Sequence, residues 1–514
     1  MLLPLCLLLD LILSGGRLVD GSGNPWRRVD VGITGDRIVA VGNLRTAEAR
    51  QRIDVTGLIV TPGFIDIHSH AGRDMFDNPT LENVVRQGIT TAFDGQDGGS
   101  SPLPLRAHLD KVAASKPIIN FGWFVGHGAI RTAVMATANR HATPEEMQSM
   151  RDLARRAMQD GAFGLSTGLF YVPGNYAPTE EVIELAKVVG SLGGMHISHM
   201  RDEAAGILDS VRETIRIGEE GGLPTQITHH KLIGSPSWGK SIDTLRIIQE
   251  ARARGVDVSV DQYPYTASHT GSAALFPQWS LEGGRASFEE RLNAPESRAR
   301  IKTEVVRRIR DDRGAGDPKN IQFNRCPFDA SLNGKTLADA TRQKGLEPTL
   351  ENAAEVAIEL QLKGGCATIY HAISEDDVER IMRYPGTMVA TDGEAPRMGQ
   401  GSPHPRAYGT FPRVLARYVR EKKILTLEDA IRRMTSLPAT RLKLYDRGLV
   451  RPGMFADILV FDPAVIADRA EFTNAHQYSV GIRDVLVNGR FILRDGMMTG
   501  EQSGQVLDGP GRTR

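Results

Sequence analysis

The sequence LIVTPGFIDIHSH, residues 58–70, combines a short apolar run, a turn signal and two histidines. Residues 64–67 predict a buried strand, which the chain enters through Pro62-Gly63. Because side chains i and i+2 of an extended chain point to the same side, His68 and His70 can converge on one point. Two such imidazoles suit a divalent metal such as zinc, although an isolated pair is more simply explained as polar residues that follow a strand. The rest of the chain decides between these interpretations.

The composition is that of an ordinary globular protein. The chain has 514 residues, 40% hydrophobic and 24% charged, which suffices for one large domain and one or two smaller ones. Lys plus Arg and Asp plus Glu both total 62, and no run of like charge forms a basic arm or an acidic tail. We therefore expect no nucleic-acid partner, and the oligomeric state stays open.

The cysteines and the N-terminus bear on the cellular location. Cys6, Cys326 and Cys366 are scattered without a CxxC motif, so they predict neither a disulfide framework nor a thiolate zinc site. Residues 1–9, MLLPLCLLL, are as apolar as a signal peptide but lack a basic start and a clear cleavage site, and they are too short to span a membrane. They are either the remainder of a signal peptide or a lead-in to the strand at 11–13. We favour a periplasmic or secreted location over the cytoplasm.

Both ends of the chain are rich in short strands separated by glycine turns. We expect residues 1–57 and 440–514 to form one small β domain assembled from both termini. The predicted strands are 10–13, 17–19, 30–33, 37–41, 456–461, 485–490 and 491–493.

The middle of the chain, about 58–439, alternates predicted strands and helices. Amphipathic helices at 179–192 and 203–220 are examples, and Thr143 and Thr179 are expected N-caps. Alternation on this scale predicts an α/β fold with a parallel sheet, namely a (β/α)8 barrel, with a doubly wound open sheet as the alternative. Besides 64–67, the predicted strands are 89–93, 118–121, 163–166, 195–198, 225–228, 256–260, 367–370 and 387–390.

Residues from about 270 to 362 interrupt this alternation. Charged helical sequence at 295–312, which begins with a proline suited to a first helical position, replaces the short loop expected of a barrel. We interpret the segment as an inserted subdomain over the barrel mouth. It is either a lid or a peripheral decoration without a catalytic part.

Several groups able to bind a metal follow predicted strands. Besides His68 and His70, these are His199 after 195–198, His229 after 225–228 and Asp392 after 387–390. In a barrel, the C-terminal strand ends form a single ring, so these groups would converge there. An exposed surface cluster is the less favoured alternative.

The chemistry that these groups permit is metal-assisted hydrolysis. Neutral imidazoles hold an ion that lowers the pKa of a bound water and polarises the scissile carbonyl. A carboxylate takes the water proton and returns it to the leaving amine. Asp392 is our candidate for this general acid/base, although an aspartate before Gly393 also suits a turn or an N-cap.

Several longer motifs surround these candidate residues or lie elsewhere in the chain. They are TPGFIDIHSH at 61–70, SHMRDE at 198–203, THHK at 228–231, DQYPYTA at 261–267, TDG at 391–393, LVRPGMFADI at 449–458 and VNG at 487–489. Together they resemble the amidohydrolase superfamily, and within it the N-acyl-D-amino-acid deacylase (D-aminoacylase) branch. The resemblance runs from Gly15 to about Gly500, and it implies a (β/α)8 barrel with a β-sandwich side domain and one or two zinc ions at the barrel mouth.

The resemblance also assigns metal ligands. It implies that His199 and His229 hold the tightly bound zinc, that His68 and His70 hold the weaker one, and that Asp392 is the general acid/base. In the family a cysteine ligand follows the second strand, whereas this chain has Asp97 at that position. A carboxylate is a harder ligand than a thiolate but still binds zinc, so we expect Asp97 to be a ligand; a turn aspartate is the alternative.

Substrate-binding residues carry over in the same way. The family holds the substrate carboxylate with basic and phenolic groups, and the matching residues are Lys231, Tyr263 and Arg406. Tyr171 is a candidate for lining the acyl or side-chain pocket. His371, after 367–370, is a candidate for polarising the carbonyl or lining the pocket. Solvation of the two cations and core packing of the two tyrosines are the alternatives.

We therefore expect a zinc-dependent hydrolase of N-acyl-D-amino acids, or of dipeptides with a C-terminal D-residue, acting on a small molecule with a free carboxylate. One alternative is a cyclic amide or imide hydrolase, similar to dihydroorotase or hydantoinase. These usually carry a carboxylated lysine after a middle strand, and residues 163–166 contain no lysine. A non-catalytic scaffold is less favoured because it would be expected to lose metal ligands.

Overall fold

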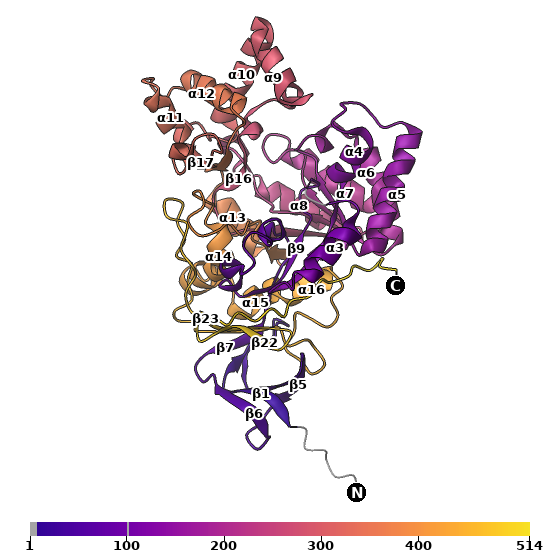
Figure 1. Ribbon diagram of the computed structural model, residues 1–514, viewed down its shortest axis with the longest axis vertical. Coiled ribbons are helices and arrows are strands. Elements are labelled where there is room, and N and C mark those ends of the chain that lie inside the picture. Colours follow the sequence, from indigo (N-terminus) through magenta and orange to yellow (C-terminus); the bar gives the residue numbers. More distant parts are fainter. Residues whose placement is uncertain (1–7, 100–101, 514) are drawn as a thin grey trace.

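The computed structural model describes residues 8–99 and 102–513. Figure 1 shows a β-rich part at the end of the molecule where the chain begins, a barrel in the middle and an inserted subdomain at the opposite end. Residues 1–7, and with them most of the predicted signal-like segment and Cys6, lie outside the described residues. Within the described residues, no helix is both long and apolar enough to cross a bilayer.

The β-rich part consists of two sheets that share one apolar core. The first sheet has the order β5-β4-β1-β6, and the second has the order β23-β22-β21-β20-β7-β2-β3. Leu13 and Val31 of the first sheet pack with Val60 and Val460 of the second, so residues from both ends of the chain bury each other. The strands are β1 (Leu9–Ser14), β2 (Arg17–Leu18), β3 (Arg27–Arg28), β4 (Asp30–Thr34), β5 (Arg37–Gly42), β6 (Ala49–Asp54), β7 (Ile59–Pro62), β20 (Ile458–Phe461), β21 (Ile482–Val487), β22 (Arg490–Arg494) and β23 (Met497–Met498).

The central strands are parallel, and their pairings return to the starting strand. β10 and β11 are separated by Phe124 alone and act as one strand, which joins β9 on one side and β12 on the other. The ring closes between the first and last strands through the parallel bridge of Ser69 with Gly393. This closure is that of the expected (β/α)8 barrel and excludes the open-sheet alternative. In order, the strands are β8 (Phe64–Asp66), β9 (Ile89–Asp94), β10 (Asn120–Trp123), β11 (Val125–Gly126), β12 (Gly164–Gly168), β13 (Met195–His199), β14 (Thr225–Ile227), β15 (Val258–Gln262) and β19 (Thr387–Val389).

Helices cover the outside of the barrel, and two helix starts bear on the sequence analysis. Thr143 caps α5 through a reciprocal capping box with Glu146. The expectation for Thr179 is wrong: Pro178 is the N-cap of α6, and the Thr179 hydroxyl instead donates to Glu213 Oε1 at 2.7 Å. The barrel helices include α3 (Leu105–Ala114), α4 (His127–Met135), α5 (Pro144–Asp160), α6 (Thr179–Ser191), α7 (Ile207–Gly221), α8 (Ser241–Ala253), α13 (Glu375–Arg383), α14 (Arg406–Arg413), α15 (Leu427–Met434) and α16 (Ser436–Arg441).

The inserted subdomain is larger than the sequence suggests. It contains an antiparallel sheet in which β18 (Ala367–Tyr370) lies between β16 (Ser268–Gly271) and β17 (Ile321–Arg325). Residues 367–370 are therefore not a barrel strand, and the insertion extends from about 268 to 370 rather than from 270 to 362. Its helices are α9 (Gly284–Asn293), α10 (Pro295–Asp311), α11 (Leu337–Gln343) and α12 (Leu350–Leu362).

A disulfide joins two strands of this subdomain, contrary to the expectation from cysteine spacing. Cys326 directly follows β17, Cys366 directly precedes β18, and their sulfur atoms are bonded. Their neighbours Arg325 and Ala367 are partners in the antiparallel pairing, which brings the two cysteines together. The pairing of distant strands cannot be read from the spacing of the cysteines.

Gly63 is where the chain leaves the β-rich part and enters the barrel. β7, which ends at Pro62, pairs with β20, whereas β8, which begins at Phe64, pairs with β9. Residues 59–62 thus belong to the β-rich part, a few residues beyond the boundary at 57 that the sequence predicts. The Gly63 amide donates to Asp457 O at 2.9 Å, and a β-carbon at this position would overlap the Thr90 side chain. Only glycine fits this crossing without displacing the neighbouring barrel strand.

We predict that Gly63→Ala lowers the stability of the whole chain. The added methyl must displace the buried Thr90 side chain, and overpacking of this kind costs about 1–3 kcal/mol. Thermal unfolding of the purified variant measures the effect. Gly42→Ala is the matched control, because a β-carbon there meets nothing within 4 Å. Equal melting temperatures for the two variants would contradict the close contact between Gly63 and Thr90.

Candidate metal centre

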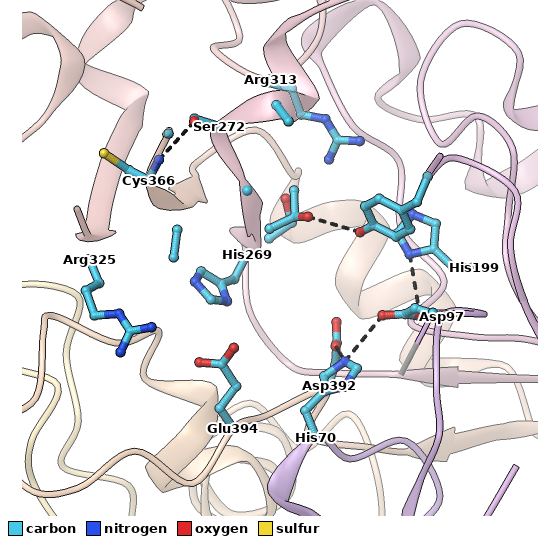
Figure 2. Close-up of a pocket in the computed structure, with 18 of the residues that line it drawn as sticks. His70, Asp97, His199, His269, Ser272, Arg313, Arg325, Cys366, Asp392 and Glu394 are labelled. Atoms are coloured by element: carbon cyan, nitrogen blue, oxygen red, sulfur yellow. Dashed lines mark hydrogen bonds and ion pairs between the residues drawn. The ribbon is translucent and has the colours of Figure 1, made fainter. Parts of the chain in front are cut away.

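Six predicted residues meet at the C-terminal rim of the barrel. His68 and His70 follow β8, His199 ends β13, and His229 follows β14. Asp97 lies in the loop after β9 and Asp392 in the loop after β19. Figure 2 shows His70, Asp97, His199 and Asp392 directed towards one space. The parallel closure of the barrel thus brings together ligands that are more than 300 residues apart.

The first cluster consists of Asp97, His199 and His229. Asp97 Oδ1 lies 3.6 Å from His199 Nδ1 and 3.5 Å from His229 Nε2, and these two nitrogens are 2.8 Å apart. All three donor atoms lie within 4.8 Å of one another, a spacing that allows them to share one metal ion.

The second cluster consists of His68, His70, Asp97 and Asp392. His70 Nε2 lies 3.1 Å from Asp392 Oδ1 and 3.3 Å from Asp97 Oδ2. His68 Nε2 lies 3.4 Å from Asp392 Oδ1 and 3.6 Å from Asp97 Oδ1. Asp97 therefore belongs to both clusters and stands between them.

The donor atoms of both clusters fit a divalent metal. His68 Nε2 and Asp97 Oδ1, which lie 3.6 Å apart, are both buried without a hydrogen-bond partner among the described residues. Buried polar atoms are normally hydrogen-bonded, so such a concentration of unpartnered atoms indicates that another group is meant to satisfy them. Imidazole nitrogens and carboxylate oxygens are ordinary ligands of zinc, and no thiolate belongs to either cluster.

Three of these residues have a strained backbone. Asp97, His229 and Asp392 adopt φ values of 57°, 36° and 49°, in the left-handed region that non-glycine residues rarely occupy. A buried carboxylate holds His229 in place, because Asp261 Oδ1 accepts from the His229 amide at 2.7 Å. Strain of this kind is characteristic of functional sites, where the surrounding structure enforces it.

Glu203 is a residue of this site that the sequence analysis did not assign. Its Oε1 accepts from Lys231 Nζ at 2.5 Å and lies 3.2 Å from His229 Nδ1, while Oε2 lies 3.8 Å from His199 Nε2. Burial alone would raise the pKa of Glu203, but Lys231 and the two histidines hold it well below its usual range. Glu203 is thus an anion that orients the rings of two candidate ligands from behind. Helix α7 begins at Ile207, not at 203 as predicted, which leaves Glu203 free to enter the site.

Asp392 contacts a cation with one oxygen and the histidines with the other. Arg406 Nη1 donates to Asp392 Oδ2 at 2.7 Å, whereas Oδ1 faces His68 and His70. Burial would raise the pKa of Asp392, but Arg406 and His68 lower it well below its usual range. Asp392 is therefore ionised and able to accept a proton.

The clusters lie at the bottom of a cavity of about 790 Å³, walled on one side by the inserted subdomain. Lys231, Tyr263, Arg406 and Tyr171 all line it, as the sequence predicts. The Tyr171 ring lies 4.6 Å from the His199 ring, and its hydroxyl is 3.1 Å from Thr270 Oγ1. The Tyr263 hydroxyl is buried without a hydrogen-bond partner among the described residues.

His371 is placed differently from the prediction. It follows β18 in the inserted sheet, its ring packs 4.6 Å from Phe472, and its Nε2 lies 3.1 Å from Gln322 Oε1. It is not among the described residues that line the cavity. The prediction failed because residues 367–370 are not a barrel strand and so do not end at the rim that carries the two clusters.

Comparisons with known proteins agree with this geometry. The model of the amidohydrolase family matches residues 332–493. D-aminoacylase of Alcaligenes xylosoxydans xylosoxydans is 38% identical over 97% of both chains, and N-acyl-D-glutamate deacylase of the same organism is 36% identical over 94% of this chain and 93% of its own. A crystal structure of D-aminoacylase superposes with a TM-score of 0.84, at 36% identity, over 97% of this chain and all of the other.

A second solved structure carries ligands. It is N-acyl-D-glutamate deacylase from Bordetella bronchiseptica, complexed with zinc and a phosphonate inhibitor. It superposes with a TM-score of 0.83, at 35% identity, over 98% of this chain and all of the other. The chain therefore belongs to the amidohydrolase family, in the group that contains D-aminoacylase and the N-acyl-D-amino-acid deacylases.

Proposed function

We propose that this protein hydrolyses the amide bond of N-acyl-D-amino acids, or of dipeptides with a C-terminal D-residue, and releases a carboxylate and a free D-amino acid. The observation that carries the proposal is the convergence of four histidines and two aspartates beneath one cavity. Similarity to D-aminoacylase and to deacylases of N-acyl-D-glutamate and N-acyl-D-aspartate over nearly the whole chain supports it.

The cofactor in this proposal is zinc, as one or two ions for each chain. Asp97, His199 and His229 would hold one ion, and His68, His70 and Asp97 would hold the other. The zinc in the similar deacylase structure and the binuclear centre described for D-aminoacylase support this assignment. Bound there, zinc would lower the pKa of a water molecule and polarise the carbonyl of the substrate.

Asp392 is the proposed general acid/base. The Asp392 oxygen that Arg406 does not contact faces His68 and His70, and the carboxylate is ionised, so it can accept the proton of the attacking water. It then returns this proton to the amine nitrogen as the carbon–nitrogen bond breaks. Arg406 keeps the carboxylate oriented through its 2.7 Å hydrogen bond to the other oxygen.

The substrate carboxylate is proposed to bind beside these residues. Arg406 and Lys231 supply positive charge, and each already contacts an enzyme carboxylate. Tyr263 lies between them, with the Arg406 guanidinium 4.8 Å from its ring centroid. Its unpartnered hydroxyl is a donor that a substrate carboxylate would satisfy.

A cyclic amide or imide substrate is less well supported. β12 (Gly164–Gly168) contains no lysine to carry a bridging carbamate. The hydantoinase structures are only 16% identical to this chain, so their likeness concerns the fold alone.

Export from the cytoplasm is a separate proposal. The Cys326–Cys366 disulfide supports it, because such bonds persist mainly in oxidising compartments. Fractionation of the native host, with a cytoplasmic marker enzyme as control, tests it; recovery in the cytoplasmic fraction would overturn it.

A paired substrate screen tests the proposed function. We expect zinc-loaded protein to release free amine from N-acetyl-D-amino acids and not from their L-enantiomers. Each enantiomeric pair is its own control, because only the configuration differs. Hydrolysis of cyclic imides alone, or of no substrate, would contradict the proposal.

We predict that Asp392→Asn lowers kcat by at least about 100-fold, because the amide cannot accept the proton. The ion held by Asp97, His199 and His229 should remain, since Asp392 is not part of that cluster. Metal analysis and steady-state kinetics on the same preparation separate the two effects. An active variant would remove Asp392 from the mechanism.

Metal affinity should rise with pH up to about 9. In the metal-free protein, burial favours neutral histidines, but Asp392 and Asp97 raise the pKa of His70, and Glu203 and Asp97 raise that of His229, in both cases to about 9. A metal binds only the neutral imidazole, so each of these histidines must lose its proton before the metal can bind. For each such proton, the apparent metal affinity should fall by about tenfold for every pH unit below about 9. Competition with a chelator, corrected for its own protonation, measures the slope, and a flat profile would contradict it.

A further inference from the structure

Arg313 is a buried cation on the cavity wall with no role in the mechanism above. It lies in the inserted subdomain, two residues after the end of α10, and it lines the same cavity as the metal clusters. The residue is only 3% exposed. Figure 2 shows its guanidinium directed into the cavity on the side of His199. The cavity therefore has a second guanidinium, away from the Asp392–Arg406 pair.

The hydrogen-bonding capacity of Arg313 is not used. Within residues 8–99 and 102–513, its Nε has no hydrogen-bond partner, and its nearest carboxylate oxygen, Asp312 Oδ1, is 3.6 Å from Nε. Its guanidinium carbon lies 4.8 Å from the ring centroid of Phe170 and 5.7 Å from that of Tyr370. Aromatic faces position the charge but do not satisfy its N–H groups.

The other buried cations of the cavity are already paired. Lys231 Nζ is 2.5 Å from Glu203 Oε1, and Arg406 Nη1 is 2.7 Å from Asp392 Oδ2. Arg73 and Arg325 also line the cavity but are exposed. Three described cations of the cavity are buried, and Arg313 is the one whose nearest carboxylate oxygen lies beyond hydrogen-bond distance, at 3.6 Å.

The position of Arg313 is fixed by its backbone. The Gly316 amide donates to Ile309 O at 3.1 Å, and Asn320 Nδ2 donates to Gly314 O at 2.9 Å, which closes the end of α10. The same loop packs directly on Gly234, where any β-carbon would overlap Asp311 O. Gly234 belongs to the loop that carries His229 and Lys231, so the guanidinium is held at a set place relative to the metal ligands.

The distance between the Arg313 guanidinium and the metal clusters suits a small substrate. The Phe170 ring that lies beneath Arg313 is 5.9 Å, centroid to centroid, from the His199 ring. One aromatic ring thus stands between the guanidinium and a candidate ligand. A substrate whose amide lies over the metal cluster can reach Arg313 with a side chain or an acyl chain of a few atoms.

We propose that Arg313 binds a second carboxylate of the substrate, so that the protein prefers N-acyl-D-amino acids carrying an additional acidic group. The inference rests on the proposed function, because it assumes that the amide is cleaved in this cavity. A guanidinium offers two parallel N–H donors that match a carboxylate, and burial strengthens such a pair. The second carboxylate belongs either to the side chain of the D-residue or to the acyl group.

Matched neutral and acidic substrates distinguish these two sources. N-acetyl-D-glutamate and N-acetyl-D-glutamine differ only in the charge of the side chain. N-succinyl-D-alanine and N-butanoyl-D-alanine differ in a carboxylate at the end of the acyl group. We expect a higher kcat/KM for the acidic member of one pair, and that pair identifies which part of the substrate Arg313 contacts.

Variants of Arg313 test the contact itself. Arg313→Met should lower kcat/KM for the preferred acidic substrate by about 100-fold and change that for its neutral partner by less than about threefold. Arg313→Lys should lie between, because it keeps the charge but loses the planar donors. Arg310→Met is the matched control, because Arg310 is exposed on α10, the helix that precedes Arg313, and its loss should leave both values unchanged. Arg325→Met tests whether exposed positive charge at the cavity entrance attracts acidic substrates. Any effect of this substitution should disappear at high salt, because salt screens exposed charges.

A binding measurement distinguishes failure of the Arg313 contact from failure of the proposed function. Calorimetry should show that wild-type protein binds glutarate more tightly than butyrate, and that Arg313→Met loses this difference. If the neutral member is preferred in both pairs, or if Arg313→Met weakens both members equally, the inference is wrong while the proposed function stands. If no N-acyl-D-amino acid is hydrolysed, the proposed function fails, and glutarate binding still decides whether Arg313 is an anion site.

Discussion

The Asp66 carboxylate joins the first and last strands of the barrel, and the metal site depends on this contact. Asp66 Oδ1 accepts from the Thr391 amide at 2.9 Å, and Oδ2 accepts from the Thr391 hydroxyl at 2.5 Å. Burial raises the pKa of Asp66 to about 7, so these hydrogen bonds hold a group that is costly to ionise there. His68 lies two residues after Asp66 and Asp392 one residue after Thr391, and the Asp392 amide donates to His68 O at 2.8 Å. The contact that closes the ring therefore also places Asp392, the proposed general acid/base, beside the histidines.

The buried charges of the site are arranged in pairs. Glu203 faces Lys231 and two histidines, Asp392 faces Arg406, and Asp97 faces all four histidines of the two clusters. Each buried charge would be unfavourable alone, and removing one partner would leave the other without compensation. The same pairing holds the rings and carboxylates in fixed orientations, which is what a preorganised hydrolytic site requires.

Local sequence was sufficient for part of this arrangement. The barrel, the β-rich ends and the histidines were predictable because each histidine follows a strand whose apolar pattern is clear. Asp97 was predictable only through the resemblance. Residues 367–370 look like a barrel strand because their sequence pattern does not show whether a strand pairs in a parallel or an antiparallel sheet. The wrong prediction for His371 follows from this wrong strand assignment. Glu203, Arg313 and the disulfide depend on contacts between distant segments, which no local pattern records.

Asp97 belongs to both clusters, so a metal ion bound in one cluster affects the binding of an ion in the other. A cation bound to one oxygen of this carboxylate withdraws electron density and negative charge from the neighbouring position. The two metal positions are therefore coupled, and by linkage each occupant weakens the affinity for the other by the same factor. The chain thus contains one strong position and one conditional position, and the concentration of free metal in its surroundings sets how many ions it carries.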